Sequence, residues 1–209
     1  MSSVSETIVR EYFELHEFLV RQHRKYIAQT RREDDDIDFF VLNPHPRKSA
    51  AALPFVLASA DLGQIERAIV VVKGWHTETF SQAVLMNAPE IFRFVEPATF
   101  KQAAKAFGAE GTQLKILVVP ALPAGAEARE QSVALLRAKG IDAVIPFQTM
   151  LAELIAKTET NRNYQKSDLL QVIRILKNYE FFKEPQMELF KPSKSRKRGR
   201  ADAVPDEVK

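Results

Sequence analysis

Glu6, Asp38 and Lys73 are side chains whose types could together carry out a reaction. Carboxylates hold a hard cation such as Mg²⁺, which keeps several of its water molecules. The cation lowers the pKa of a bound water and neutralises developing charge, while a lysine can orient the water or a phosphate. If these three side chains meet at one edge of a sheet, they suit Mg²⁺-assisted hydrolysis of a phosphodiester.

Lys73 stands at the end of a predicted buried strand. The residues from Ala68 to Val72 are all apolar, most of them are β-branched, and Gly74 bounds the run downstream. A charge at this position costs several kcal/mol when it is unpaired, so we expect a partner in the acidic cluster around Asp38. The alternative is that the lysine emerges into solvent with its stem along the core.

Asp38 lies in a second predicted strand, over residues 36–43. Alternation places Asp36 and Asp38 on the face that holds Phe40, and Ile37 on the opposite face. Glu6 belongs to an earlier segment, the first turn of a predicted helix over residues 5–17, where a carboxylate suits the helix dipole. Ser5 is the expected N-cap of that helix, and a strand over residues 18–24 follows it.

The remaining segments alternate between helical and strand patterns. Several of the apolar runs are bounded by glycine or proline, which stop regular structure. Strand–helix–strand repeats in the later part favour parallel pairing, so we predict an α/β fold with a mixed sheet. The expected segments are a short extra strand at 55–57, helices at 78–87, 97–108, 126–139, 147–157 and 167–177, and strands at 114–119 and 141–146.

Composition limits the classes of function. Of 209 residues 45% are hydrophobic, which is enough for one domain with a core, and the absence of cysteine excludes disulfides, thiolate metal sites and a cysteine nucleophile. No apolar run approaches the roughly 18 residues that span a bilayer, and the N-terminus lacks the pattern of a secretory signal. We therefore expect a cytoplasmic protein without a membrane partner.

The positive charge of the chain is concentrated at its end. From Lys191 onward there are seven basic and three acidic residues, a net of +4, so the body carries 23 basic and 24 acidic residues, a net of −1. We interpret residues 1–185 as one domain and residues 186–209 as a basic tail that we expect to be disordered. In the tail, Lys197 and Arg198 can contact phosphates without reading sequence.

Three stretches carry a resemblance to a known family. They are V-S-E-T-I-V-R-E-Y-F-E-L-H-E-F-L-V-R, I-D-F-F-V and I-V-V-V-K-G-W. Their order resembles the restriction-endonuclease-like fold of the PD-(D/E)XK nucleases, closest to the Holliday-junction-resolvase and Mrr-like branches, over about residues 4–85. The resemblance implies a three-layer fold with a mixed central sheet. It also implies that Glu6 is the opening-helix glutamate, Asp38 the metal-binding aspartate and Lys73 the catalytic lysine.

Val71 departs from that family pattern, because the family has an acidic residue two positions before the lysine. Valine cannot bind a metal. One possibility is that Glu78, from the start of the following helix, or Asp36 takes the place of the missing carboxylate. The other is that cleavage has been lost while the scaffold has been kept for binding. The hypotheses are a nucleic-acid-binding protein, most simply of DNA, with a degenerate metal site; an active Mg²⁺-dependent DNA endonuclease; and a non-catalytic protein-interaction subunit. A homodimer or a protein partner is compatible with each.

Other residues near these stretches are candidates for contact with nucleic acid. Arg21, Arg24 and Lys25 precede the acidic cluster and could contact the nucleic-acid backbone or neutralise the cluster. Trp75 is interpreted as a packing anchor rather than a platform for a base. His76 is interpreted as an ordinary surface group, with contact to a phosphate or a metal as the alternative.

Overall fold

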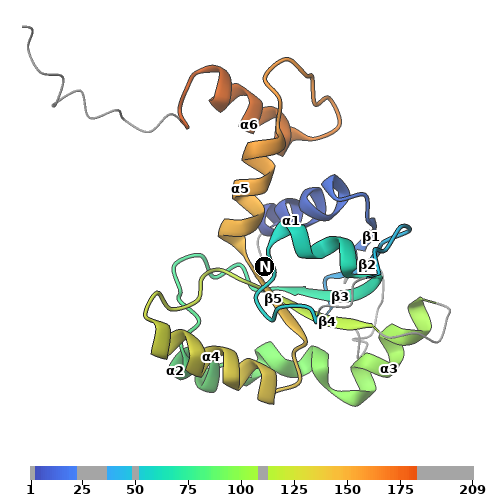
Figure 1. The fold of residues 1–209 in the computed structure, drawn as a ribbon, viewed down its shortest axis with the longest axis vertical. Helices are drawn as coiled ribbons and strands as arrows, with labels where there is room; N and C mark the ends of the chain where they lie inside the picture. The colour runs from blue at the N-terminus through green and yellow to red at the C-terminus, as the bar shows by residue number, and fades with distance from the viewer. Residues whose placement is uncertain (1–2, 23–36, 49–51, 108–112, 183–209) are drawn as a thin grey trace, which may run out of the picture.

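A five-stranded mixed sheet forms the centre of the molecule in the computed structural model, which describes residues 3–22, 37–48, 52–107 and 113–182 (Figure 1). The strands lie in the order β1-β2-β3-β4-β5, with β2 antiparallel to β1 and β3, and with β3, β4 and β5 mutually parallel. This confirms the predicted α/β class with a mixed sheet. The strands are β1 (Leu19–Gln22), β2 (Phe39–Leu42), β3 (Arg67–Val72), β4 (Leu114–Val119) and β5 (Ala143–Pro146).

Helices cover both faces of this sheet (Figure 1). Six α-helices and two short 3₁₀ helices are found in the described residues: α1 (Ser3–Leu15), η2 (Ser59–Gln64), α2 (Gln82–Asn87), η3 (Pro89–Val95), α3 (Pro97–Ala106), α4 (Ala126–Ala138), α5 (Phe147–Lys157) and α6 (Asp168–Asn178). On one face, Val70 and Val72 of β3 share a core cluster with side chains of α1 and α5. On the other face, Ile69 and Val71 share a cluster with side chains of α2, η3 and α4.

Most predicted elements are present, and several have other bounds: the strand predicted over residues 36–43 begins at Phe39 and the one predicted over residues 141–146 begins at Ala143. The helix predicted over residues 5–17 begins at Ser3, and Ser5, the expected N-cap, is fully buried inside α1. The helix predicted from Glu78 begins at Gln82, because the Ser81 hydroxyl caps it by accepting a hydrogen bond from the Val84 amide. The expected extra strand at 55–57 is a short parallel bridge to β5, with the Leu57 amide donating to the Val144 carbonyl at 2.9 Å.

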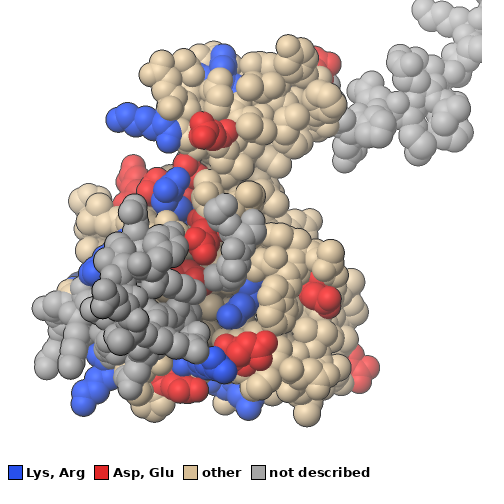
Figure 2. Space-filling view, turned by 180° about the vertical axis from the view of Figure 1, so that it is seen from behind, with Lys and Arg blue, Asp and Glu red and all other residues tan. Residues whose placement is uncertain are grey.

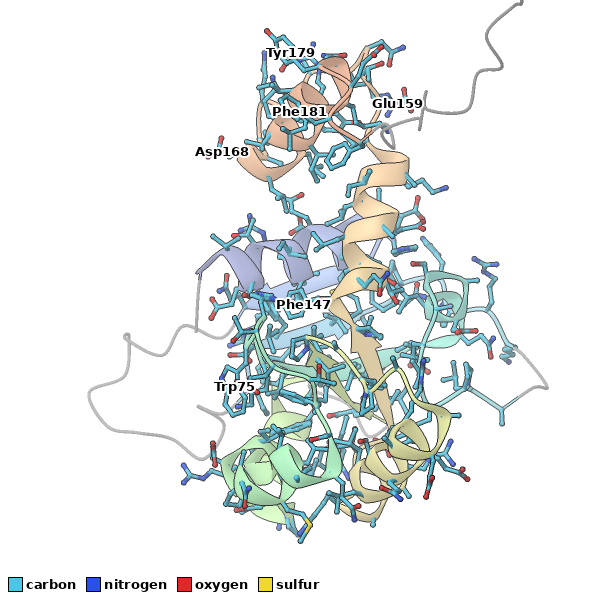
Figure 3. All side chains as sticks on the ribbon, turned by 90° about the vertical axis from the view of Figure 1, so that its left-hand side faces the viewer. Trp75, Phe147, Glu159, Asp168, Tyr179 and Phe181 are labelled. Carbon is cyan, nitrogen blue, oxygen red and sulfur yellow. The ribbon has the colours of Figure 1, made fainter. Side chains whose placement is uncertain are left out.

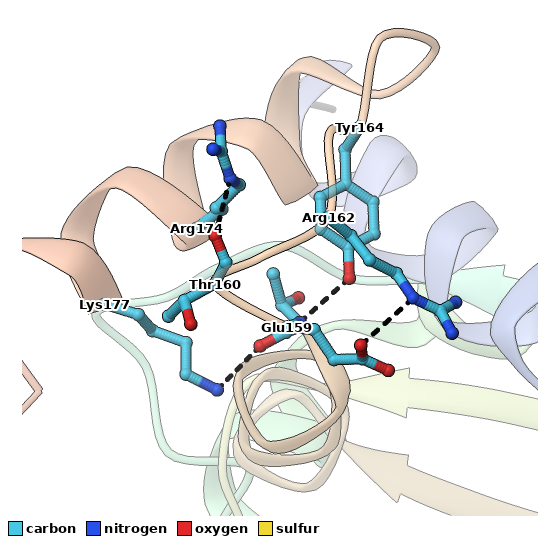
Figure 4. A network of polar contacts seen from close by, with 7 residues as sticks. Glu159, Thr160, Arg162, Tyr164, Arg174 and Lys177 are labelled. Carbon is cyan, nitrogen blue, oxygen red and sulfur yellow. Dashed lines mark hydrogen bonds and ion pairs between the residues drawn. The ribbon is translucent and has the colours of Figure 1, made fainter.

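Helix α5 runs from the end of β5 past α1 and beyond the sheet, and α6 packs at its far end (Figures 1 and 3). A polar network holds the two helices together (Figure 4). The Lys177 ammonium donates to the carbonyls of Ile155 and Thr158 at 2.8 and 2.7 Å, and Arg174 donates to the Thr160 carbonyl at 3.0 Å. The basic side chains of α6 therefore satisfy carbonyls that the end of α5 leaves open.

The predicted boundary at residue 185 and the basic tail lie outside the described residues. Within the described ranges, the helices are all too short or too polar to cross a lipid bilayer.

Candidate functional site at the Asp38–Lys73 edge of the sheet

The end of β1, the start of β2 and the end of β3 meet at one edge of the sheet. The register pairs Gln22 with Phe39 and Phe39 with Val70. Because β2 runs antiparallel to both neighbours, Asp38 immediately before β2 and Lys73 immediately after β3 come to the same edge. The structure thus brings these two predicted site residues together in the fold, although they lie 35 positions apart in the sequence.

Asp38 is a buried carboxylate with a structural role. Its side chain is 2% exposed, and Oδ2 accepts a hydrogen bond from the amide of Val72 at 2.8 Å. A buried carboxylate needs such donors, because burying it without hydrogen bonds is costly in free energy. The carboxylate therefore pairs with a main-chain amide at the end of β3.

The backbone at Asp38 does not follow the expected alternation. The Asp38 amide donates to the carbonyl of Val70 at 3.1 Å, although the register pairs Val70 with Phe39. This one-residue offset resembles the doubling of residues in a β-bulge. As a result Ile37 packs in the same core cluster as Phe40, and the prediction that Ile37 faces the opposite side of the sheet is wrong.

Lys73 continues the line of β3 beyond its last residue. Its amide donates to the carbonyl of Val118 in β4 at 3.0 Å, and its side chain is half-buried. The lysine therefore leaves the sheet between β2 and β4, at the carboxyl ends of the parallel strands.

Val71 is a core residue. It is 1% exposed and packs with Ile69, Phe40 and Phe80 in the cluster beneath the sheet. At the position where the nuclease family has a second metal-binding carboxylate, this chain thus has an apolar side chain surrounded by other apolar side chains.

Glu6 is held at the same edge by a contact that the sequence did not reveal. Its Oε2 accepts a hydrogen bond from the side-chain amide of Gln22 at 2.6 Å, so α1 is joined to the end of β1. Gln22 pairs with Phe39, which is next to Asp38 in the chain. The Glu6 carboxylate is therefore linked through Gln22 to the edge that carries Asp38.

The two carboxylates predicted to stand in for an acidic residue at position 71 are in different situations. Glu78 is exposed and lies in the turn before α2, where its amide donates to the Trp75 carbonyl at 2.8 Å. It does not stand at the start of the following helix as predicted, because Ser81 caps that helix later in the chain. Outside the described residues lie Asp36, Arg24, Lys25, Lys197 and Arg198.

Metal ligands do not gather in the part of the chain that the structure describes. Across residues 3–22, 37–48, 52–107 and 113–182, no three His, Asp or Glu side chains form a group that could hold a metal ion. Glu6, Asp38 and Glu78 all belong to these ranges, so they do not form such a group among themselves.

The segment after Lys73 packs against both α1 and α5. The hydroxyl of buried Ser5 lies 2.9 Å from Nε2 of His76, and the imidazole ring meets the Phe147 ring edge-on at 4.6 Å. Gly74 permits this approach, because a Cβ on it would lie 2.5 Å from the Ser5 hydroxyl oxygen. Trp75 contacts Phe80 and the core cluster beneath the sheet, which confirms its interpretation as a packing anchor.

Arg21 is the predicted backbone-contacting cation that the structure describes. Its side chain is exposed, with the guanidinium carbon 5.9 Å from the centre of the Phe40 ring. On the face shown in Figure 2, basic and acidic side chains are interspersed among the residues drawn in colour. Arg21 is therefore open to a ligand from solvent.

The helix that carries Glu6 is anchored by two titratable side chains. The Tyr12 hydroxyl lies 3.0 Å from the Ser59 hydroxyl, and burial raises the pKa of Tyr12 to about 12. His16 lies against α5 with Nε2 at 4.0 Å from a carboxylate oxygen of Glu153, and burial lowers the pKa of His16 despite that carboxylate. Both groups are therefore neutral at pH 7 in the packed helix.

A cavity of about 600 Å³ lies away from this edge, between α1 and the start of α6. Its lining is of mixed charge and includes Thr7, Arg10, Glu11, Ser167 and Asp168. None of the predicted site residues lines it, so it forms no part of the Asp38–Lys73 edge.

No protein-family model matches the sequence, and no curated protein and no solved structure is significantly similar to it.

Proposed function

We propose that the chain is a nucleic-acid-binding protein with a nuclease-like fold whose metal site is degenerate. The observation that carries this proposal is that Asp38 and Lys73 lie at one edge of the sheet, while a buried Val71 occupies the position of the second carboxylate. The first two residues argue for a phosphate-directed ancestry of the edge, and the third argues against efficient cleavage.

The arrangement of elements supports the nuclease-like part of the proposal. An opening helix with a glutamate, a strand, an antiparallel strand preceded by an aspartate and a strand followed by a lysine occur in the implied order. The sheet is mixed and has helices on both faces, as that resemblance implies.

The contacts at the edge support the degenerate part. One oxygen of Asp38 already accepts from the Val72 amide, and one oxygen of Glu6 already accepts from Gln22. A Mg²⁺ ion bound to protein usually takes one or two carboxylates and several waters in near-ideal octahedral geometry. With Val71 buried, a metal here would need Asp36 or a displaced Glu78.

Binding of nucleic acid is tested with duplex and branched DNA across a series of salt concentrations. We expect binding that weakens steeply with salt, because phosphate contacts release counterions. Arg21→Gln should weaken binding and lower the salt slope by about 1. Arg93→Gln, an exposed basic residue on η3, is the matched control and should leave both quantities unchanged. Absence of binding at low salt would overturn the proposal in favour of a protein-interaction subunit.

Metal dependence is tested by calorimetric titration of Mg²⁺ and Mn²⁺, with a plasmid-nicking assay on the same samples. We expect no metal-dependent nicking. Nicking that disappears in Asp38→Asn would instead establish the second hypothesis, an active Mg²⁺-dependent endonuclease. In that case Glu78→Gln and Asp36→Asn identify which carboxylate has replaced the one missing at Val71.

A further inference from the structure

Helix α6 and the residues that follow it carry exposed apolar side chains at the end of the molecule furthest from the sheet, where Figure 3 labels Tyr179 and Phe181. Val172, Ile175 and Tyr179 recur at a helical spacing, and Phe181 and Phe182 follow after Glu180. These five side chains, here called the α6 apolar face, are between 42% and 75% exposed.

The α6 apolar face is separate from the buried side of the helix, and Val172, at one end of the face, also lines the cavity between α1 and the start of α6. Ile173 is buried in the core cluster, and Leu169 and Leu170 are partly buried against it. Residues spaced three and four apart share one side of a helix, so a second stripe at 172, 175 and 179 is a surface for another element to pack on. In the described residues, this stripe is open to solvent.

We infer that two copies of this chain associate through their α6 apolar faces, with the two α6 helices packed antiparallel about a two-fold axis near Ile175. Helix α6 lies at the end of the α5 extension, so a contact made there is remote from the sheet (Figures 1 and 3). The same surface on both copies makes the contact isologous, which closes the assembly at a dimer.

Side-chain size along α6 fits pairing with its own copy. An antiparallel arrangement places the small Val172 opposite the large Tyr179 of the partner subunit, so that a large side chain packs against a small one. Opposite helix dipoles align favourably in the same arrangement.

The area of the face matches what a stable dimer requires. An aromatic side chain buries about 200 Å², so the exposed fractions of these five side chains leave roughly 500 Å² of apolar surface per copy. Two copies would bury about 1,000 Å², close to the apolar share of a standard interface of about 1,600 Å².

Aliphatic Val172 and Ile175 form part of the stripe and do not stack on bases, which favours a protein over a single-stranded nucleic acid.

The oligomeric state of the full chain tests this inference by sedimentation equilibrium. A monomer has a mass of 23.7 kDa, and we expect a concentration-dependent species of twice that mass at protein concentrations up to roughly 100 µM. Ile175→Asp should weaken the dimer by about 100-fold or more, because it buries a charge at the centre of the contact. Met86→Asp, at a 67% exposed position on α2, is the matched control and should dimerise like the wild type.

Cysteine cross-linking tests the arrangement of the helices, since the chain has no cysteine of its own. Ile175→Cys should form a covalent dimer on mild oxidation, because a disulfide needs Cα atoms within about 7 Å, as near a two-fold axis. Met86→Cys should remain monomeric under the same treatment.

A wild-type chain that stays monomeric throughout the concentration range would overturn the inference. So would a dimer that Ile175→Asp leaves intact, since another surface would then be responsible. Circular dichroism and thermal unfolding of each variant verify that loss of the dimer is not loss of the fold. DNA binding measured on the monomeric variant separates this surface from the proposed function, because Arg21 and the Asp38–Lys73 edge are unchanged in it.

Discussion

Asp38 shows how one residue can serve the fold at a position that also suits chemistry. Because β2 begins only at Phe39, it does not supply a main-chain acceptor for the Val72 amide. The Asp38 carboxylate, which is 2% exposed, accepts that hydrogen bond instead. The presence of an aspartate at this position therefore has a structural explanation that is independent of a metal. Its substitution should change stability as well as any activity.

We predict that Asp38→Ala lowers the free energy of unfolding by about 2 kcal/mol, because the buried Val72 amide loses its acceptor. Asp38→Asn should lose less, since its side-chain oxygen can still accept that hydrogen bond. Urea unfolding monitored by circular dichroism measures the difference. Wild-type stability in both variants would mean that the carboxylate serves chemistry alone.

His16 makes the stability of the α1–α5 contact depend on pH. Burial lowers its pKa in the folded chain below the ordinary value of 6.5, so the unfolded chain binds a proton more readily. The neutral ring is compatible with the fold above pH 6.5. The free energy of unfolding decreases as the pH falls below 6.5. This decrease ends once the pH is below the pKa of His16 in the folded chain.

We predict that His16→Gln reduces this loss of stability between pH 7.5 and pH 5, as measured by thermal unfolding. Glu153→Gln should make the loss larger, because Glu153 is the neighbouring carboxylate that favours the charged ring. Identical dependence of thermal stability on pH in the wild type and in His16→Gln would show that other groups cause the loss of stability at low pH.

At the scale of elements, the exit of β3 is fixed by close packing on α1. Gly74 meets the hydroxyl of Ser5, and His76 adds contacts to Ser5 and Phe147. The loop after Lys73 thus touches both helices on that face of the sheet. This packing determines the direction in which the chain leaves the candidate site.

We predict that Gly74→Ala lowers the free energy of unfolding by about 1–3 kcal/mol, because the new Cβ overlaps the Ser5 hydroxyl. Combining it with Ser5→Ala should cost less than the sum of the two single substitutions, since the closest clash is removed. Gly125→Ala is the control, as nothing lies within 4 Å of its added Cβ. Strict additivity in urea unfolding would contradict the proposed overlap.

The Lys177 ammonium makes two of the hydrogen bonds at the junction of α5 and α6. Lys177 donates to two carbonyls near the end of α5, which keeps α6 at the tip of that helix (Figure 4). A charged donor to two partly buried acceptors contributes more than an exposed ion pair does. The placement of the α6 apolar face follows from this contact.

We predict that Lys177→Met, which keeps the length of the side chain, lowers the free energy of unfolding by about 2 kcal/mol through loss of both hydrogen bonds. Lys166→Met, at an exposed lysine in the preceding loop, should have no measurable effect in the same urea titration. Equal midpoints for the two variants would show that apolar packing alone holds α6.

At the scale of the whole molecule, the inferred dimer links stability to concentration. We predict that the melting temperature rises as the protein concentration is increased, because association stabilises only the folded chain. In Ile175→Asp the melting temperature should be independent of concentration. A wild-type melting temperature that does not change across a hundredfold dilution would contradict dimerisation in this range.

Local sequence signals accounted for most of the elements. The strand at 114–119 and the helix at 147–157 were predicted with the bounds that the structure has, and the helix predicted from residue 167 begins at Asp168, with the Ser167 hydroxyl as its N-cap. Their apolar periods, caps and proline stops lie within a few residues of each other, so no distant contact is needed to read them. Helix η3 was missed, because its apolar side chains follow no helical or strand period.

The mixed α/β class and the apolar side chain at position 71 followed from the sequence alone, because periodicity and residue type are local properties of the chain. The tertiary structure alone decided what the polar groups contact: Asp38 with the Val72 amide, Glu6 with Gln22, and Ser5 with His76. It also decided that one side of α6 stays exposed. These features depend on strand register and on helix packing between segments up to 71 positions apart, which no local pattern encodes.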